Sequence, residues 1–209
     1  MDAKKFFGER YAQTLLGNPE AIRKIDPISQ GILGKVYDAL DHETIHVGTV
    51  IDYGCGVGKM VPFLLQAFKP KKYIGMDIVP AVIKSNKAFY RDLEGVEFKS
   101  ATGLAKSKAD VIFTASTLQH IDDEAVEKTI ADFAKVLNPG GRLIVWVNTA
   151  VAKGDLPYMK RRDKNVYIQM IKDAGFTNGN GITIPIDDEE ITVFISRKKE
   201  KAKGGKGKK

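Results

Sequence analysis

Residues 52–58 combine one acidic side chain with three glycines, residue types that can hold a ligand close to the backbone. The segment reads Asp52-Tyr53-Gly54-Cys55-Gly56-Val57-Gly58 and follows the apolar Val50 and Ile51. Glycine allows a sharp turn and a close approach of the main chain to a ligand. Apolar residues at helical spacing come next, so the first amides of a helix should face the same place. The pattern predicts a strand, a glycine turn and a helix around a binding site.

The spacing of these glycines differs from that of two common nucleotide-binding loops. The dinucleotide fingerprint needs a glycine where this chain has Lys59, and a P-loop needs Ser or Thr where it has Met60. A second acid, Asp77, follows about twenty residues later, where an acid binds ribose hydroxyls in mononucleotide-binding βαβ units. The alternative interpretation is a tight strand-to-helix turn that binds nothing.

Apolar segments alternate with amphipathic helical patterns through most of the chain. This order predicts a doubly wound, mostly parallel sheet with helices on both faces. The strands expected after the glycine turn lie at 72–78, 96–99, 109–115 and 142–147. Two closing β segments, 182–186 and 191–195, have a short acidic connection and should form an antiparallel hairpin. Pro185 places the first of them at a sheet edge.

Helical spacing also occurs twice before the first strand, at 7–15 and at 32–40. We expect these helices to pack over the carboxyl ends of the strands, where an open α/β sheet binds its ligand. The predicted organisation is an N-terminal helical cap at 1–48, a ligand-binding domain at 49–196 and a disordered basic tail at 197–209.

Several motifs in order make the chain resemble the class I S-adenosylmethionine (SAM)-dependent methyltransferases. Residues 52–58 resemble their motif I, and residues 109–121 (ADVIFTASTLQHI) resemble motif IV and its exit. Residues 137–145 (LNPGGRLIV) resemble the family's L-x-P-G-G-x-L stretch, and 174–176 resemble the A-G-F before its last two strands. The resemblance implies a seven-stranded Rossmann-like sheet with an antiparallel last strand, and SAM as the cofactor of the 49–196 domain.

The resemblance also implies roles for single residues. Those expected along the methionine part of SAM are Gly54, Gly56, Gly58, Thr114 and Ser116. Asp52 is expected near the SAM amino group, Asp77 at the ribose hydroxyls and Ile78 against the adenine. The chain departs from the family after the third strand, where an acid often reaches the adenine amino group. Here no acid is present, and Thr102 is the candidate for that contact.

Methyl transfer is an in-line displacement at carbon, so the protein mainly aligns the nucleophile and excludes water. A base is needed only when the nucleophile must lose a proton. His120 is the catalytic candidate, because it follows the fourth strand at the mouth of the expected cleft and an imidazole pKa of about 6.5 suits proton transfer. Alternatively, His120 forms local hydrogen bonds that shape the strand exit.

The candidates for substrate contact are Tyr11, Gln119, Tyr158, Arg161 and Arg162. An arginine in the loop that contains Tyr158 could hold a carboxylate or phosphate of the substrate. The alternative interpretations are a solvated basic loop and, for Tyr11, simple core packing.

Composition limits the expected partners. The net charge of +7 lies in residues 197–209, which hold eight of the 33 basic residues and one of the 26 acidic ones, so the rest carry 25 of each. Any nucleic-acid contact should therefore be weak and confined to the tail. Cys55 is the only cysteine, which leaves no internal disulfide, makes a cysteine-built metal site improbable and fits a reducing cytoplasm. No apolar run approaches membrane-spanning length.

Three functions remain open at this point. The first is a SAM-dependent methyltransferase that modifies an oxygen, nitrogen or carbon nucleophile of a small molecule, which could be anionic. The second is a methyltransferase of RNA, DNA or protein guided by the basic tail, and the third is a non-catalytic SAM-binding scaffold. Residues 114–117 lack the [DN]-P-P-[FYW] of amino-methylating nucleic-acid enzymes, which favours the first.

Overall fold

The computed structural model describes residues 3–40, 47–177 and 180–199, and within them seven strands form one sheet in the order β3-β2-β1-β4-β5-β7-β6. The strands are β1 (Thr49–Tyr53), β2 (Lys72–Asp77), β3 (Val96–Ser100), β4 (Ala109–Ala115), β5 (Leu137–Asn148), β6 (Asn180–Ile186) and β7 (Glu189–Arg197). β7 runs antiparallel to both of its neighbours, β5 and β6, and the pairs from β3 to β5 are all parallel. The predicted mostly parallel sheet with an antiparallel last strand is confirmed, and Pro185 lies in the edge strand β6 as expected.

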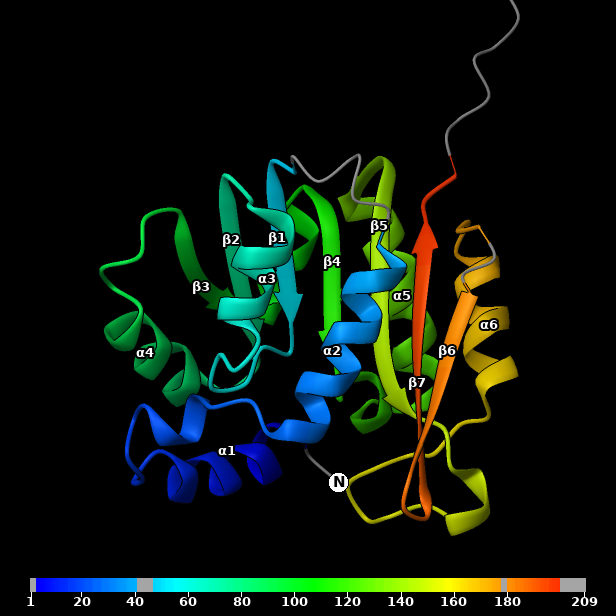
Figure 1. The fold of residues 1–209 in the computed structure, drawn as a ribbon, viewed down its shortest axis with the longest axis horizontal. Helices are drawn as coiled ribbons and strands as arrows, with labels where there is room; N and C mark the ends of the chain where they lie inside the picture. The colour runs from blue at the N-terminus through cyan, green and yellow to red at the C-terminus, as the bar shows by residue number, and fades with distance from the viewer. Residues whose placement is uncertain (1–2, 41–46, 178–179, 200–209) are drawn as a thin grey trace, which may run out of the picture.

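The parallel strands end at the lower edge of the sheet in Figure 1, and α1 (Ala3–Thr14) lies across that edge. Strands β2 and β3 lie on one side of β1, whereas β4 and β5 lie on the other. At such a reversal, the connections that follow neighbouring strands leave in opposite directions and open a crevice. The topology therefore brings the glycine loop after β1 next to the segment after β4.

Helices cover both faces of the sheet, with α2 and α3 on one face and α5 and α6 on the other (Figure 1). The remaining helices and 3-10 turns are η1 (Ala21–Arg23), α2 (Pro27–Ala39), α3 (Val61–Phe68), α4 (Pro80–Phe89), η3 (Ala101–Lys106), η4 (Leu118–His120), α5 (Asp123–Val136), η5 (Val151–Lys153) and α6 (Lys164–Asp173). Across the described ranges, no helix combines the length and the apolarity that a membrane crossing requires.

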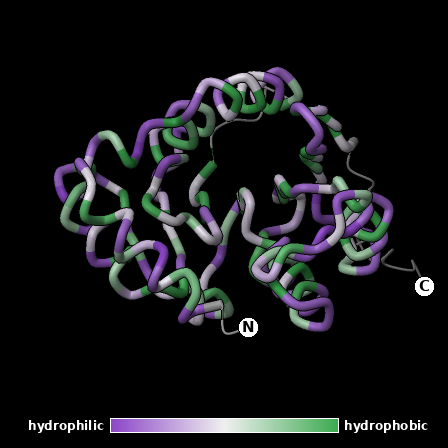
Figure 2. Tube along the Cα trace, turned by 90° about the horizontal axis from the view of Figure 1, so that it is seen from below, coloured by the Kyte–Doolittle hydropathy of each residue, from purple (hydrophilic) through white to green (hydrophobic). Residues whose placement is uncertain are grey.

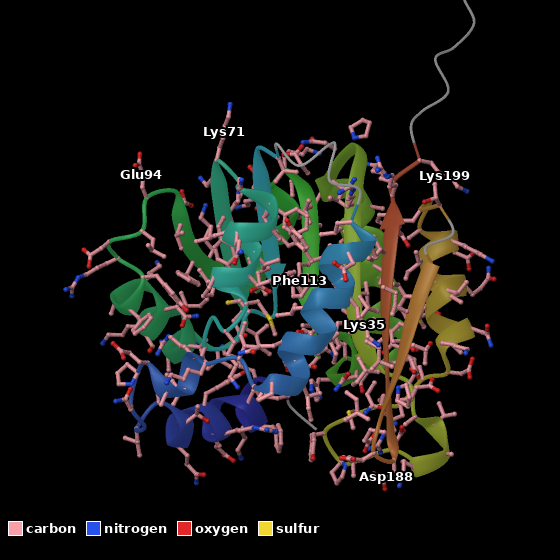
Figure 3. All side chains as sticks on the ribbon, viewed as in Figure 1. Lys35, Lys71, Glu94, Phe113, Asp188 and Lys199 are labelled. Atoms are coloured by element: carbon pink, nitrogen blue, oxygen red, sulfur yellow. The ribbon has the colours of Figure 1, made fainter. Side chains whose placement is uncertain are left out.

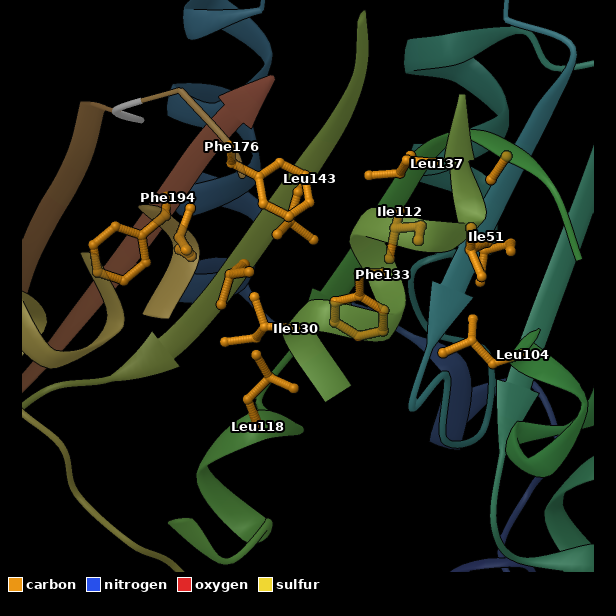
Figure 4. Packing of buried hydrophobic residues seen from close by; sticks show 14 of the residues in the cluster. Ile51, Leu104, Ile112, Leu118, Ile130, Phe133, Leu137, Leu143, Phe176 and Phe194 are labelled. Carbon is orange, nitrogen blue, oxygen red and sulfur yellow. The ribbon is translucent and has the colours of Figure 1, made fainter. Parts of the chain in front are cut away.

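Successive residues of a central strand enter different layers, because strand side chains alternate between the two faces. On β4, Ile112 belongs to the buried cluster that contains Phe133 of α5 (Figure 4), whereas Phe113 belongs to the cluster that contains Phe68 of α3. Figure 3 shows Phe113 in the interior and charged side chains such as Lys71 at the periphery. Both sheet faces are therefore apolar, as a parallel sheet covered on both sides requires.

The N-terminal helices do not form the single cap expected for residues 1–48. Helix α1 and the turn η1 lie at the carboxyl edge as predicted, but α2 packs on the sheet face, where Ile32, Leu33 and Val36 are buried. These residues form an apolar stripe at helical spacing, and the sheet face buries it more completely than a polar cleft would. The part that covers the edge is residues 3–23, called the N-terminal segment below.

The folded body also extends beyond the expected boundary at residue 196. Strand β7 continues to Arg197, and Lys198 pairs with Phe176 in an isolated β-bridge. The Lys198 amide donates to the Gly141 carbonyl at 2.8 Å, and its Nζ donates to the Leu137 carbonyl at 2.6 Å. The apolar pattern of β7 ends earlier than its hydrogen bonds, which explains the misplaced boundary. Residues 200–209 lie outside the described part of the chain, so the disorder of this tail stays a prediction.

We predict that two truncations will separate the folded end from the tail. Removing residues after Arg197 deletes the Lys198 bonds and the Lys199 amide bond to the Gly175 carbonyl. The free energy of unfolding should fall by about 2 kcal/mol, since each such bond contributes about 0.5–1.5 kcal/mol net. Removing residues after Lys199 should leave stability unchanged. Urea unfolding measures both, and equal losses would contradict the boundary.

Candidate functional site

A cavity of about 590 Å³ lies at the carboxyl edge of the sheet, between the strand ends and the N-terminal segment. Figure 2 looks onto this edge from below. The lining residues that precede β1 are Phe7, Arg10, Tyr11, Thr14, Ala21, Ile22, Asp26 and Ser29. The lining residues from the strand ends and the loops after them are Asp52, Tyr53, Gly54, Cys55, Gly56, Val57, Lys59, Met60, Asp77, Ile78, Ala101, Ala115, Ser116, Thr117, His120, Ile121 and Trp146.

The glycine loop is anchored to the end of β2. The amides of Gly54 and Cys55 both donate to the Met76 carbonyl, at 2.7 and 2.9 Å. Gly56 has a φ of 51°, and a Cβ built there would lie 2.7 Å from the Tyr11 hydroxyl oxygen, so this position needs glycine for its conformation and for its neighbour. The loop can therefore present bare backbone to the cavity while Tyr11 of α1 lies against it.

Asp52 is a buried carboxylate at the cavity wall, with 2% of its surface exposed. One of its oxygens accepts a hydrogen bond from the Tyr73 hydroxyl at 2.8 Å. Burial raises the pKa of Asp52 from 3.8 to about 7, the bond from Tyr73 opposes the rise and the charge of Asp77 adds to it. A cationic group in the cavity would favour the ionised form of this acid.

Asp77 has both carboxylate oxygens held by backbone amides. Its Oδ2 accepts from the Gly56 amide at 3.0 Å, and its Oδ1 accepts from the Val79 amide at 2.9 Å. Burial raises the pKa of this carboxyl, and the amide bonds act against that rise. Each oxygen has lone-pair capacity left for a hydroxyl donor, so Asp77 can bind a ligand and hold the glycine loop at once.

His120 lies where η4 ends, between the cavity and the loop after β5. Its Nδ1 lies 2.5 Å from the Tyr158 carbonyl oxygen, which can only accept, so the ring proton is on Nδ1 and the neutral ring keeps Nε2 as a base. The ring also packs edge-on against Phe7, with centroids 4.8 Å apart. Burial lowers the pKa of His120, the positive charge of Arg10 lowers it further, and backbone hydrogen bonds at Tyr158 and Ser116 oppose this. The ring is therefore neutral at neutral pH.

The structure brings eight of the sequence-predicted site residues to the cavity: Tyr11, Asp52, Gly54, Gly56, Asp77, Ile78, Ser116 and His120. The other seven, which do not line it, are Gly58, Thr102, Thr114, Gln119, Tyr158, Arg161 and Arg162.

Three expected cofactor residues have other surroundings. Gly58 has a φ of 80°, and a Cβ there would lie 2.7 Å from the Tyr90 ring, so this glycine makes room for α4. Thr102 is exposed, and its hydroxyl lies 3.0 Å from the Ser100 hydroxyl, while its neighbour Ala101 lines the cavity. Thr114 is fully buried within β4. Sequence position alone did not distinguish these residues from their cavity-lining neighbours.

Arg161 and Arg162, expected at the substrate, lie outside the cavity, and internal groups hold both guanidinium groups. Arg161 pairs with Glu189 at 2.7 Å, and only 4% of its side chain is exposed. Arg162 donates to Asp123 at 2.7 Å and to the carbonyls of Leu118 and Ile121. A buried charge must be compensated, and the partners of Arg162 fasten its loop to η4.

Two more substrate candidates, Gln119 and Tyr158, also lie outside the cavity and have structural contacts. Gln119 accepts from the Asn148 amide at 2.8 Å and donates to the Met159 sulfur, so it fastens η4 to the end of β5. Tyr158 stacks on Phe6 of α1 with ring centroids 5.1 Å apart. Its carbonyl orients His120, so the contribution of Tyr158 to the site comes from its backbone.

Sequence reasoning missed several lining residues, chiefly Phe7, Arg10, Lys59 and Trp146. Arg10 and Phe7 share a helix face with Tyr11 by spacing, which could have suggested a common role. Trp146 is buried at the end of β5, and its indole Nε1 has no hydrogen-bond partner in the described part of the chain. Within that part, no group of His, Cys, Asp and Glu side chains is arranged to hold a metal ion.

Comparison with known proteins agrees with this geometry. Residues 50–141 match a family described as methyltransferase domain. Phosphoethanolamine N-methyltransferase 1 of Triticum aestivum is 28% identical over 114 residues, which cover 51% of this chain and 22% of that protein. The protein of the same name from Arabidopsis thaliana is 31% identical over 144 residues, which cover 62% and 28%. The chain thus spans less than a third of the length of these relatives.

A solved structure extends the likeness to the whole chain. The N-methyltransferase NodS of Bradyrhizobium japonicum, in complex with S-adenosylhomocysteine (SAH), superposes with a TM-score of 0.74 and 17% identity. The match covers 96% of this chain and 100% of that one. The domain match at residues 50–141 and the shared fold thus agree with the resemblance to class I SAM-dependent methyltransferases.

We predict that Asp52→Asn will raise the stability of the folded chain and lower its affinity for SAH. In the folded chain Asp52 holds its proton up to about pH 7, so its ionisation makes folding less favourable as pH rises from 3.8 to that value. The variant should be the more stable protein at about pH 8. It should bind SAH more weakly by about 1.5–3 kcal/mol, because the charged partner of the amino group is gone.

Calorimetry and thermal melts at about pH 6 and pH 8, on either side of this pKa, measure both effects. SAH affinity of the wild type should rise between these values, and that of Asp52→Asn should stay flat. Tyr73→Phe is the control, because it removes the hydroxyl bond and keeps the carboxyl. A pH-independent wild type would contradict the assignment of Asp52.

Proposed function

We propose that this chain is a SAM-dependent methyltransferase that transfers a methyl group to a small molecule. The observation that carries the proposal is one cavity in which the glycine loop, the buried acids Asp52 and Asp77 and the neutral His120 meet. The family's methyl donor needs such a cradle, and the chemistry needs a dry, shaped space beside it. The nucleophile can be oxygen, nitrogen or carbon.

The residues of the cavity fit SAM group by group. The Val57 amide donates to no other group in the described part of the chain, so it is free for a carboxylate. Asp52 would hold the amino group, Asp77 the ribose hydroxyls, and Ile78 the adenine ring. When bound, SAM supplies a methyl group on a sulfonium, which is a good leaving group. Tyr11 keeps its proton, because burial raises its pKa to about 12, and so it stays a hydroxyl donor over the glycine loop.

In this proposal His120 is the general base for a nucleophile that must lose a proton. The Tyr158 carbonyl holds the Nδ1 proton, which leaves Nε2 to accept a proton from the substrate. Phe7 packs edge-on against the ring and supports its position. The alternative role, a histidine that only shapes the exit from β4, uses the same Tyr158 bond, and the pH dependence of the rate distinguishes the two.

We further propose that the substrate is anionic and that Arg10 contacts it. Arg10 and Lys59 line the cavity, and no ion pair holds either of them within the described residues. The two plant relatives are named for phosphoethanolamine, a small molecule with a phosphate. In this proposal the anion contact lies on α1 and not on the loop of Arg161 and Arg162.

Two further parts of the proposal concern setting and partners. A cytoplasmic setting is suggested by the single, buried, free Cys55.

The alternative function is a methyltransferase with a macromolecular substrate, and it would use weak nucleic-acid contact through residues 200–209. Filter binding with tRNA at increasing salt tests it, and a salt-sensitive affinity that vanishes on deletion of those residues would favour it.

We predict that SAH binds this chain with micromolar affinity and raises its melting temperature by mass action. Nicotinamide dinucleotides should give no heat. Gly56→Leu is the matched negative variant, because its side chain would meet the Tyr11 hydroxyl and fill the cradle. Absence of heat with both SAM and SAH in the wild type would overturn the methyltransferase proposal.

We predict that kcat/KM for an acceptor such as phosphoethanolamine will rise with pH through a midpoint below the ordinary histidine value of 6.5. The reason is that only neutral His120 accepts a proton. Arg10→Ala should move this midpoint to higher pH, because it removes a positive charge that disfavours the imidazolium, and should raise KM for the anion. His120→Ala should lower the plateau by about 10²–10⁴ and abolish the midpoint.

SAH affinity of both variants serves as the control and should match the wild type, because neither side chain is assigned to the cofactor. An unchanged pH midpoint in His120→Ala would assign His120 a purely local role.

A further inference from the structure

Arg23 connects the N-terminal segment to α4 through its guanidinium group. The residue is buried, with 6% of its surface exposed. Its Nη1 donates to the Pro19 carbonyl at 2.8 Å, and its Nη2 donates to the Ser85 hydroxyl at 2.9 Å and to the Asn86 Oδ1 at 3.2 Å. The guanidinium carbon also lies 4.2 Å from the centroid of the Phe89 ring. One side chain from η1 thus contacts three residues of α4, which Figure 1 shows above this part of the chain.

Asn86 carries this contact onward to the glycine loop. The residue is fully buried, and its Nδ2 donates to the Gly56 carbonyl at 2.7 Å. One turn further along α4, the Tyr90 hydroxyl donates to the Gly58 carbonyl at 2.8 Å. Helix α4 therefore holds two carbonyls of the loop from behind, and Arg23 holds the Asn86 amide that makes the shorter of these bonds.

The Asn86 bond sets the direction of an amide that faces the cavity. A trans peptide is planar, with its carbonyl and its N–H on opposite sides. A Gly56 carbonyl that points back to Asn86 therefore directs the Val57 N–H away from α4. Val57 lines the cavity, and its amide is the donor without a partner in the described part of the chain. Rotation of this peptide would remove the donor from the site.

The other end of the N-terminal segment contacts the same loop from the cavity side. The Tyr11 hydroxyl oxygen lies 2.7 Å from the position that a Gly56 Cβ would occupy. Gly56 is therefore enclosed between Tyr11 in front and the Asn86–Arg23 pair behind. Movement of residues 3–23 would disturb the loop at both places.

We propose that Arg23 and Asn86 are positioning residues that couple the seating of the N-terminal segment to the orientation of the Gly56–Val57 peptide, and hence to cofactor binding. This inference rests on the proposed function for the identity of the cofactor. Coupling is reciprocal, so a bound cofactor holds residues 3–23 in place as strongly as those residues favour the cofactor.

The test compares Arg23→Met, Asn86→Ala and the double variant with the wild type. Methionine keeps the apolar contact with Phe89 and removes the hydrogen bonds. Each single variant should weaken SAH binding about tenfold by calorimetry, within the usual range of coupling between sites. The double variant should bind as weakly as Asn86→Ala alone, because Arg23 acts through Asn86.

Hydrogen exchange adds a readout that a merely structural role would not change. In the wild type, SAH should slow amide exchange in residues 3–23. In both single variants this protection should be lost even at saturating SAH. Arg142→Met is the matched control, since Arg142 is 7% exposed and lies beside Val111 near the start of β4, away from the cavity. It should lower the melting temperature without changing SAH affinity or protection.

The possible failures are distinguishable. A wild type that does not bind SAH overturns the proposed function and this inference with it. Variants that melt earlier but bind and protect as the wild type does overturn this inference alone. Additive losses of affinity in the double variant would also overturn it, because they would show that Arg23 and Asn86 act independently. If Asn86→Ala does not fold, Asn86→Ser, whose shorter side chain falls short of Gly56, takes its place.

Discussion

The site depends on the hydrogen bonds that tie the glycine loop to the end of β2. The Met76 carbonyl accepts from two successive loop amides, and Asp77 accepts from the next one, Gly56. These bonds leave the loop little freedom to move relative to the sheet. Because the chain order reverses between β1 and β4, the anchored loop lies beside the segment that carries His120. A rigid parallel sheet thereby fixes the distance between the cofactor cradle and the candidate base.

Two buried acids at the cavity wall are an unfavourable electrostatic arrangement. Asp52 and Asp77 are both buried, and the charge of Asp77 opposes the ionisation of Asp52. Buried carboxylates are stable as ions only with partners, and here the partners are a tyrosine hydroxyl and backbone amides. A ligand that brings a cationic amino group and hydroxyl donors would relieve this state. In the proposed cofactor site, folding stability and cofactor affinity are therefore in opposition at Asp52.

The N-terminal segment completes the cavity, and it is attached to the rest of the fold on two sides. The stacking of Tyr158 on Phe6 and the edge-on contact of Phe7 with His120 join α1 to the loop after β5 and to η4. Arg23 joins the same segment to α4 on the other side of the cavity. The segment thus bridges the two halves of the sheet across the switch point. Arg161 and Arg162, by contrast, do not line the cavity and pair with Glu189 and Asp123.

The sequence alone determined the fold and predicted a cofactor cradle, because both depend on local patterns. Alternating apolar segments predicted the order of strands and helices, and the spacing of Asp52, Gly54 and Gly56 predicted the turn beside Asp77. The position of His120 after β4 likewise predicted that it lies at the cavity. Each of these residues lies at the carboxyl end of a strand or shortly after it, so its place at the sheet edge follows from its position in the chain.

Only the tertiary structure decided which side chains beyond the strand ends face the cavity. Arg161 lies close to Tyr158 in sequence, yet its guanidinium pairs with Glu189 of β7. Arg10 carries no sequence signal of its own, yet α1 places it at the cavity and near His120. Asn86 bonds to Gly56, thirty residues away. Such contacts depend on how helices pack across the sheet, and a single sequence does not encode that packing in any local spacing.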